Sequence, residues 1–133
     1  MIYVLDACAM IAYLRDESGA DVVEACLADE ANDCLAHAVN LCEVYYDFAR
    51  ADTLTVADEA VATLLADGVV LREDMDIPFW KSLGQVKMRG GISLADCFAI
   101  ALAQRTGAEV LTSDRREFEP VAAQGLCLVR FFR

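Results

Sequence analysis

The sequence predicts one α/β domain, residues 1–133, built on a parallel β-sheet of four or five strands with helices on both faces. Short apolar runs alternate along the chain with longer stretches in which apolar residues recur at helical spacing. Such alternation is typical of right-handed crossovers around a parallel sheet that is covered on both sides. The 133 residues fit one domain, and two prolines and seven glycines leave little material for a linker. We therefore expect no internal domain boundary.

The first half of the chain predicts two strands and four helices. Residues 2–5 form an apolar run that ends at Asp6, which is typical of a buried strand. Leu41, Val44 and Phe48 recur at helical spacing and predict a helix. The expected elements of this half are strand 2–5, helix 8–14, helix 19–30, strand 34–37, helix 40–50 and helix 56–66.

The second half continues the alternation. A helix is expected over residues 78–88, with Pro78 in its first turn and the Gly90–Gly91 pair beyond its end. The strongest helix of the chain covers residues 93–106, between a serine at its start and a glycine after its end. The other expected elements are strand 69–72, strand 110–112, a polar loop from residue 114, and residues 126–131, which can form a fifth strand.

Cysteine use and hydropathy indicate a cytoplasmic protein. The six cysteines form no C-x-x-C pair and most lie in apolar periodic stretches, so we expect small buried hydrophobic residues in a reducing compartment. His37 is the only histidine, which disfavours a structural zinc site, and we expect it to be a strand-end residue. No apolar stretch approaches the roughly 20 residues that cross a bilayer. The N-terminus reaches Asp6 without the pattern of a signal peptide.

The formal net charge of −11 argues against a general nucleic-acid binder, since such proteins present a basic surface to the phosphates. An RNA substrate remains compatible with this charge if part of it is concentrated in a metal pocket and a few arginines grip the substrate locally. The charge also suggests a basic protein partner.

Four acidic residues are expected at one edge of the sheet. Asp6 ends the first strand and Asp114 follows the fourth, while Glu43 and Asp96 lie in the first turns of two helices. In parallel sheets of this kind, ligands bind at the carboxyl ends of the strands, where the strand order reverses. The four carboxylates can therefore share one crevice.

Helix capping is the competing explanation for these acids. Acidic side chains complement the dipole at a helix N-terminus and accept its free N–H groups. Asn40-x-x-Glu43 and Ser93-x-x-Asp96 both resemble capping boxes. Capping does not explain why two strands that are expected to be neighbours both end in aspartate.

A divalent cation explains the acids together. Carboxylates that lie close to one another raise each other's proton affinity, and a hard cation relieves the repulsion. Mg²⁺ or Mn²⁺ takes oxygen ligands and leaves positions for phosphate oxygens. Such an ion can activate water without a histidine base, which suits a chain with a single histidine.

Four segments carry a resemblance to a known family. They read VLDACAMI from Val4, NLCEV from Asn40, GISLADCFAIA from Gly91 and LTSDRREF from Leu111. Together, and in this order, they resemble the PIN domain, and within it the VapC-like ribonuclease toxins of bacterial toxin–antitoxin modules. The resemblance extends over essentially the whole chain.

The resemblance implies a single PIN-like domain with Mg²⁺- or Mn²⁺-dependent endoribonuclease activity, frequent homodimerisation and neutralisation by a small antitoxin with a basic tail. The family's acidic quartet is matched, by position, by Asp6, Glu43, Asp96 and Asp114. Thr112 matches the hydroxyl residue two before the last aspartate, and Asn40 is expected to support the site. Cys8 departs from the serine, threonine or asparagine usual at its position, and a thiol is a poorer hydrogen-bond partner.

Other classes of protein fit less well. A phosphoacceptor receiver domain needs an acidic pair and a late strand-end lysine, and a haloacid-dehalogenase-type phosphatase needs aspartate in place of Cys8. A PIN-like module that binds RNA or protein without cutting remains the alternative to a nuclease.

Two arginines and several aromatic residues are candidate contacts for the substrate. Arg115 and Arg116 follow Asp114 in the expected loop, where they can contact an RNA phosphate or simply lie in solvent. Four aromatic residues can stack on bases or pack in the core or a dimer interface. These are Tyr45, Tyr46, Phe48 and Trp80.

Overall fold

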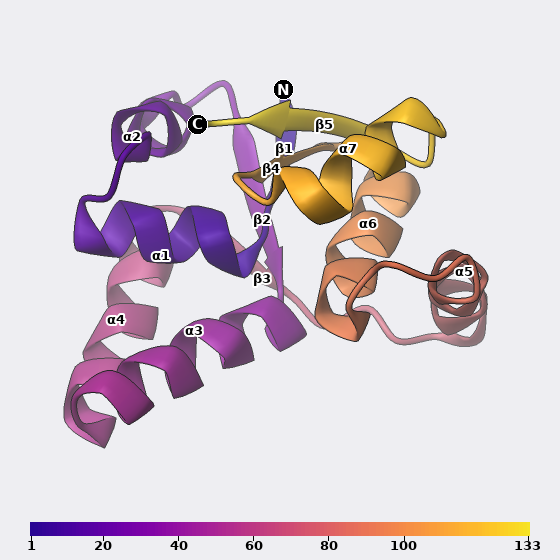
Figure 1. Cartoon of the computed structure of the whole chain (residues 1–133). Coiled ribbons are helices and arrows are strands. Elements are labelled where there is room, and N and C mark those ends of the chain that lie inside the picture. The colour runs from indigo at the N-terminus through magenta and orange to yellow at the C-terminus, as the bar shows by residue number, and fades with distance from the viewer.

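A computed structural model describes residues 1–133 and contains one sheet of five parallel strands (Figure 1). Their order across the sheet is β3-β2-β1-β4-β5, and every neighbouring pair is parallel. The strands are β1 (Ile2–Leu5), β2 (Asp33–His37), β3 (Val69–Arg72), β4 (Glu109–Thr112) and β5 (Leu128–Phe131). The parallel α/β fold is confirmed, with the fifth strand present and β1 next to β4.

Seven helices connect the strands. They are α1 (Ala7–Arg15), α2 (Ala20–Ala28), α3 (Ala38–Ala51), α4 (Leu54–Ala66), α5 (Ile77–Lys87), α6 (Leu94–Thr106) and α7 (Arg115–Ala123). Six of them were expected from helical periodicity. No helix is long and apolar enough to cross a membrane.

The polar loop expected after residue 114 is wrong, because the chain forms α7 there. The helix begins with three charged residues and contains Pro120, so its apolar periodicity is weak. Only Phe118 and Val121 are buried, at the spacing of one helical turn. Asp114 caps the helix by accepting from the backbone N–H of Glu117 at 3.1 Å.

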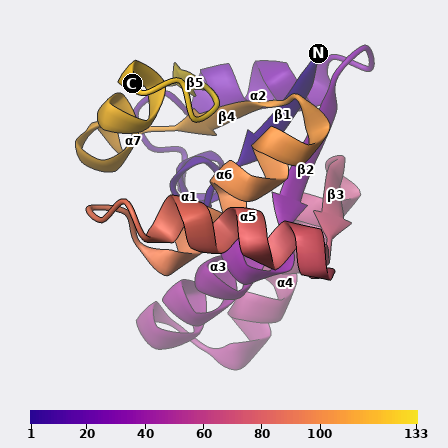
Figure 2. The same ribbon diagram turned by 90° about the vertical axis from the view of Figure 1, so that its right-hand side faces the viewer.

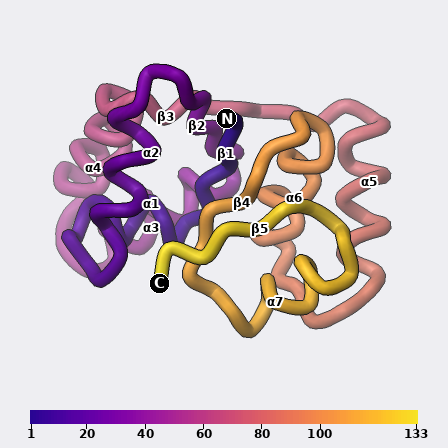
Figure 3. Tube along the Cα trace, turned by 90° about the horizontal axis from the view of Figure 1, so that it is seen from above, coloured from indigo at the N-terminus to yellow at the C-terminus, as the bar shows by residue number.

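Two apolar clusters cover the two faces of the sheet. Adjacent β1 residues point to opposite faces, so Val4 packs with α5, α6 and α7 while Leu5 packs with α1 to α4. Figure 3 shows these two groups of helices on either side of the strands. Figure 2 shows α5 lying outside α6, as an outer layer of its side. A sheet buried on both faces explains why β1 reads as a continuous apolar run.

His37 ends β2 and caps α3, which agrees with its expected strand-end position. Its Nδ1 accepts from the backbone N–H of Val39 at 3.1 Å, and its Nε2 lies 2.9 Å from the carbonyl oxygen of Asp74. The imidazole therefore holds its proton on Nε2 and donates it to that carbonyl. Because both ring nitrogens are engaged, His37 is a structural residue.

The cysteines are all free thiols. Cys26, Cys34 and Cys97 are buried, as expected for small hydrophobic residues. The same expectation is wrong for Cys8 and Cys42, which are exposed.

Candidate functional site

Asp6 lies at the centre of the carboxyl edge of the sheet, between β1 and α1. Only 1% of the residue is exposed. Its Oδ1 accepts from the backbone N–H of Ala9 at 2.9 Å, and its Oδ2 accepts from the hydroxyl of Thr112. Thr112 is fully buried at the end of β4, and its Oγ1 in turn accepts from the backbone N–H of Asp114 at 3.0 Å. Thr112 therefore links the two strand-end aspartates.

Ser93 caps α6 and positions Asp96. Its Oγ accepts from the backbone N–H of Asp96 at 3.2 Å, as in a capping box. The reciprocal bond is made by another residue, because the N–H of Ser93 donates to Oε2 of Glu117 on α7 at 3.2 Å. The expected Ser93–Asp96 box is therefore only half correct, and the carboxyl group of Asp96 is left available to the site.

Asp96, Asp114 and Glu117 form the acidic cluster. A carboxylate oxygen from each residue lies within 4.8 Å of the others, which is a spacing that one metal ion can bridge. The sequence prediction missed Glu117. Its position three residues after Asp114 matches the capping-box spacing and could have pointed to it, had α7 been recognised as a helix.

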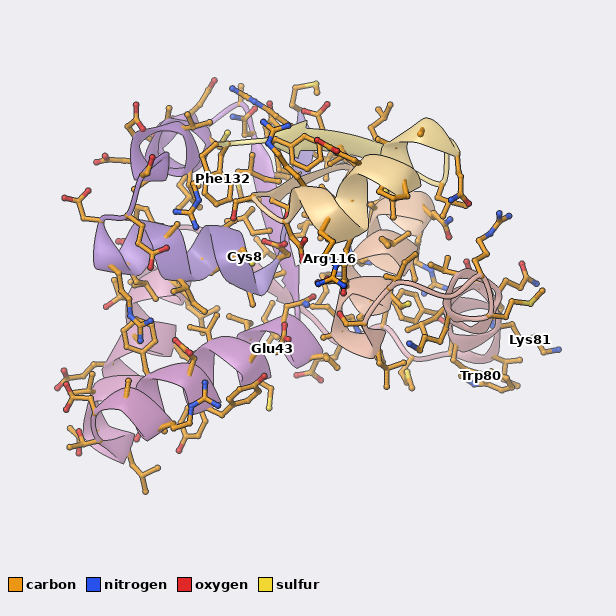
Figure 4. The ribbon with its side chains drawn as sticks, viewed as in Figure 1. Cys8, Glu43, Trp80, Lys81, Arg116 and Phe132 are labelled. Carbon is orange, nitrogen blue, oxygen red and sulfur yellow. The ribbon has the colours of Figure 1, made fainter.

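Glu43 was expected in the first turn of its helix but lies in the second turn of α3, because α3 begins at Ala38, and it stands beside Asn40 and outside the three-carboxylate cluster. The predicted Asn40–Glu43 capping box is wrong, because His37 is the cap of α3. Asn40 is instead fully buried and donates through Nδ2 to Oε2 of Glu43 at 3.4 Å and to the carbonyl of Ala95 at 3.1 Å. Asn40 thus ties α3 to the first turn of α6. In Figure 4, Glu43 lies opposite Cys8 and Arg116.

The carboxyl groups of the site are crowded and buried, so their ionised forms are disfavoured. Burial raises the pKa of Asp6 to about 7, and the charges of Glu43 and Asp114 act in the same direction. Burial also raises the pKa of Asp96, as does its hydrogen bond to Glu117, and that bond lowers the pKa of Glu117. Asp96 therefore donates a proton to the Glu117 carboxylate in the absence of a cation.

These residues fit a hard divalent cation. Carboxylate oxygens are the ligands that Mg²⁺ and Mn²⁺ prefer, and a cation would let the crowded carboxyl groups ionise together. Asn40 supplies a further sign, because its buried Oδ1 has no hydrogen-bond partner. An unpartnered buried acceptor is costly, so a bound ion or its water would satisfy it.

Cys8 lies beside the acidic residues. Protein atoms crowd its sulfur, although the residue as a whole is exposed, and this burial of the sulfur raises its pKa to about 12. The charges of Asp6 and Asp96 add to the effect. Cys8 is therefore a neutral thiol at neutral pH.

The two neighbouring arginines behave differently. Arg115 turns away from the site, where it donates to the terminal carbonyl of Arg133, pairs with Glu119 at 3.4 Å and lies over the ring of Phe131. Arg116 makes none of the ion pairs found in the structure, and it directly precedes Glu117 in the first turn of α7. Of the two arginines, Arg116 is the one free to meet a phosphate at this site.

The fold and the acidic cluster define a class of protein: a small doubly wound α/β domain with an acidic centre where the strand order reverses. Residues 3–124 match the sequence model of the PIN domain, and the chain belongs to the PIN domain family. The resemblance seen in the sequence is thereby confirmed. No curated protein matches the chain in sequence.

Solved structures with the same fold include toxins and toxin–antitoxin complexes. VapBC2 from Rickettsia felis, bound to a promoter DNA fragment, has a TM-score of 0.78 at 13% identity and covers 98% of both chains. A toxin–antitoxin complex from Klebsiella pneumoniae has a TM-score of 0.70 at 14% identity, again over 98% of both chains. Mycobacterium tuberculosis VapC20, a toxin that cleaves the sarcin–ricin loop, has a TM-score of 0.69 at 16% identity, over 94% of this chain and 95% of VapC20.

Proposed function

We propose that this chain is a divalent-metal-dependent endoribonuclease and the toxin of a toxin–antitoxin pair. The observation that carries the proposal is the acidic cluster, in which carboxylate oxygens of Asp96, Asp114 and Glu117 lie within 4.8 Å of one another beside the buried Asp6. Within a PIN domain, such a cluster at the carboxyl edge of the sheet suits phosphodiester hydrolysis.

The residues of the site divide into metal ligands and supports. Mg²⁺ or Mn²⁺ is the proposed cofactor, and when bound it activates water and stabilises the leaving oxygen. The proposed ligands are Asp6, Glu43, Asp96, Asp114 and Glu117. Thr112 holds the Asp6 carboxylate through its hydroxyl, and Asn40 holds Glu43.

RNA is the proposed substrate. The guanidinium of Arg116 contacts a phosphate beside the scissile bond, since it forms no ion pair and directly precedes Glu117 in the first turn of α7. VapC20, which shares the fold, is a toxin that cleaves the sarcin–ricin loop, and this supports an RNA substrate here. The fold does not select among transfer, ribosomal and messenger RNA.

A small antitoxin with a basic inhibitory tail is the proposed partner, and both act in the cytoplasm. The net charge of −11 favours encounter with a basic protein, and solved neighbours of this fold were crystallised as toxin–antitoxin complexes. A homodimer is the proposed assembly, as the family resemblance implies.

Cleavage of an end-labelled RNA pool tests the proposed function. The purified chain is expected to cut RNA with Mn²⁺ or Mg²⁺ and to stop when the metal is chelated. Asp96→Asn should abolish cleavage, whereas Glu119→Gln, at an exposed position of α7, should leave it intact. RNA that is bound but never cut, across both metals, would indicate a non-cutting PIN-like binding module.

A further inference from the structure

One segment of this acidic chain carries only positive charge. Residues 77–95 contain Lys81, Lys87 and Arg89 and no aspartate or glutamate, and they form the longest acid-free stretch of a chain whose net charge is −11. Most of the segment is α5, the outer helix of its layer. Charge of one sign on one element points to an anionic partner for that element.

The cations of this segment are also the ones left unpaired. Six arginines form ion pairs with carboxylates: Arg15, Arg50, Arg72, Arg105, Arg115 and Arg133. The five cations outside these pairs are Lys81, Lys87, Arg89, Arg116 and Arg130. Three of the five therefore belong to α5 and its end, and a fourth lies at the acidic cluster.

Two of these cations connect the end of α5 with α6 and α7. Lys87 donates to the carbonyl of Ile92 at 2.7 Å, one residue before the serine that caps α6. Arg89 donates to Oε1 of Gln124, the residue that ends α7, at 3.3 Å. Both acceptors are neutral, so the contacts fix the side chains without pairing their charge, and the charge of Lys87 acts on Glu117 of the acidic cluster.

The outer side of α5 has the form of a binding surface. Phe79, Leu83 and Val86 are buried against the rest of the fold, and Trp80, Gly84 and Lys87 recur at the same helical spacing on the exposed side. Trp80 is 45% exposed, and Figure 4 shows it with Lys81 on the outer side of the helix. At 1.5 Å per residue, Trp80 and Lys87 are separated by about 10 Å along the helix axis.

Gly84 is unexplained by the packing of the chain itself. It lies in the middle of α5, where glycine is a poor helix former, and its φ is not in the left-handed region. A Cβ added at this position would meet no atom within 4 Å. The missing side chain leaves bare backbone between Trp80 and Lys87, where a ligand can approach closely.

We propose that the α5 face, consisting of Trp80, Lys81, Gly84, Lys87 and Arg89, binds single-stranded RNA and leads it into the acidic site. An exposed aromatic ring among cations is the arrangement that binds single strands, with a base on the ring and phosphates beside the cations. The RNA backbone crosses the helix at Gly84. The inference rests on the proposed function for the identity of the substrate.

Charge favours RNA over the other candidate occupants of the α5 face. A second copy of the chain that paired through the same surface would bring the lysines of both copies together, because a two-fold interface places a patch on itself. A basic antitoxin tail would be repelled. An anionic strand is the occupant whose charge is complementary.

Binding of a fluorescein-labelled random-sequence RNA oligonucleotide tests the inference. The full chain carries Asp96→Asn in every sample, so that RNA is not consumed during anisotropy measurements. Trp80→Ala should weaken binding about fivefold to a hundredfold, the range expected for a lost base stack. Lys81→Gln should lower the slope of log Kd against log salt by about 1. Arg130→Gln removes an unpaired cation from outside the α5 face and should change neither quantity.

Gly84→Gln separates a binding role from a structural one. Glutamine is a better helix former than glycine and meets no neighbour, so the melting temperature should stay equal or rise. RNA binding should nevertheless weaken, because the glutamine side chain covers the bare backbone between Trp80 and Lys87. If Gly84 instead has a structural role, the melting temperature should fall and RNA binding should stay unchanged.

Unchanged Kd in both Trp80→Ala and Gly84→Gln would overturn the inference. If light scattering then shows that these variants lose dimer mass, the α5 face is an interface between copies. The proposed function is judged separately by cleavage with the unaltered chain. If the α5 face binds RNA but no metal-dependent cleavage occurs, the nuclease proposal is refuted and the RNA-binding surface stands. If the chain cleaves RNA and the α5 variants have an unchanged KM, the nuclease proposal stands and the RNA-binding surface is refuted.

Discussion

Glu117 accepts the backbone N–H of Ser93 at 3.2 Å, across 24 positions of sequence, and so takes the place that Asp96 would fill in a local capping box. The two residues belong to different helices, because Ser93 caps α6 and Glu117 lies in the first turn of α7. The contact keeps the Asp96 carboxyl group turned toward the cluster with Asp114. Glu117 thus has two roles, as a support for α6 and as a member of the acidic cluster.

Glu117→Ala should therefore affect metal binding more than folding. Loss of the cap should cost about 1 kcal/mol of unfolding free energy, the usual size for a helix N-terminus. Mn²⁺ affinity, measured by calorimetry, should fall at least about tenfold to a hundredfold, the loss that removal of a residue supporting a metal ligand already causes. Glu119→Ala, two residues along α7 and exposed, is the matched control and should leave the affinity unchanged. An unaltered Mn²⁺ affinity in Glu117→Ala would limit this residue to capping.

The fold follows from patterns that are local in the sequence. Alternating strands and helices predict the parallel sheet, and the expectation that its first and fourth strands are neighbours is confirmed, because β1 lies next to β4. Helical periodicity does not predict α7, because only Phe118 and Val121 are buried in it and Pro120 interrupts the pattern. A helix that is mostly polar gives little periodic signal.

The site is less accessible from sequence than the fold, since its decisive contacts are not local. Asn40 and Glu43 have the spacing of a capping box, but His37 occupies the cap of α3, and Asn40 turns to the carbonyl of Ala95 instead. That bond spans 55 positions of sequence. The hydrogen bond from Asn40 to Ala95 depends on the packing of α3 against α6, and a local sequence motif does not predict such packing.

Metal-free protein should lose stability as the pH rises from about 4 to about 7. The Asp6 pKa is about 7 in the folded chain against 3.8 for the free group, so the folded state holds the proton more tightly. The stabilisation is complete below the unfolded value and is lost as the pH passes the folded one, with an upper size of about 4 kcal/mol. Urea unfolding in the presence of a chelator, at several pH values, measures the slope.

Asp6→Asn should reduce that slope, of which the raised pKa of Asp96 leaves a part, and should abolish RNA cleavage. Asparagine keeps a hydrogen-bond acceptor for Ala9 but carries no charge to be ionised in the buried position. Asp58→Asn, on the exposed side of α4, should keep both the slope and the cleavage. A slope of the same size in Asp6→Asn would show that other groups cause it.

Cys8→Ser should raise the rate of RNA cleavage. With a pKa of about 12 the thiol stays neutral, and it is a weak donor and acceptor beside the carboxylates. A hydroxyl at this position would gain a hydrogen bond of ordinary strength, which corresponds to an increase of about two- to tenfold in kcat. Single-turnover cleavage of a fixed RNA under saturating Mn²⁺ measures it, with Cys42→Ser as the matched exposed cysteine. A lower cleavage rate in Cys8→Ser would contradict the prediction and would show that the thiol itself contributes to cleavage.

The antitoxin prediction follows from the charge of the acidic cluster. An arginine from a basic tail can form bidentate ion pairs with carboxylates such as Asp96 and Asp114. Its guanidinium would then occupy the place of the metal. Co-expression with the neighbouring open reading frame, followed by pull-down of the tagged chain, should recover a small basic protein. The recovered complex should be inactive on RNA, and its association rate should fall steeply as salt is raised, because long-range attraction to a chain of net charge −11 speeds encounter.

Substitutions can locate the inhibitory contact. The double variant Asp96→Asn and Asp114→Asn should bind the partner more weakly, since a guanidinium loses two charged acceptors, and the loss should appear mainly as faster dissociation. Asp21→Asn together with Asp58→Asn removes the same charge from exposed positions of α2 and α4 and should slow association slightly while leaving dissociation unchanged. If both pairs behave alike, the partner responds to overall charge and does not enter the site. Recovery of no small protein, with expression of the chain alone causing no growth arrest, would count against the toxin role and leave a nuclease without a dedicated inhibitor.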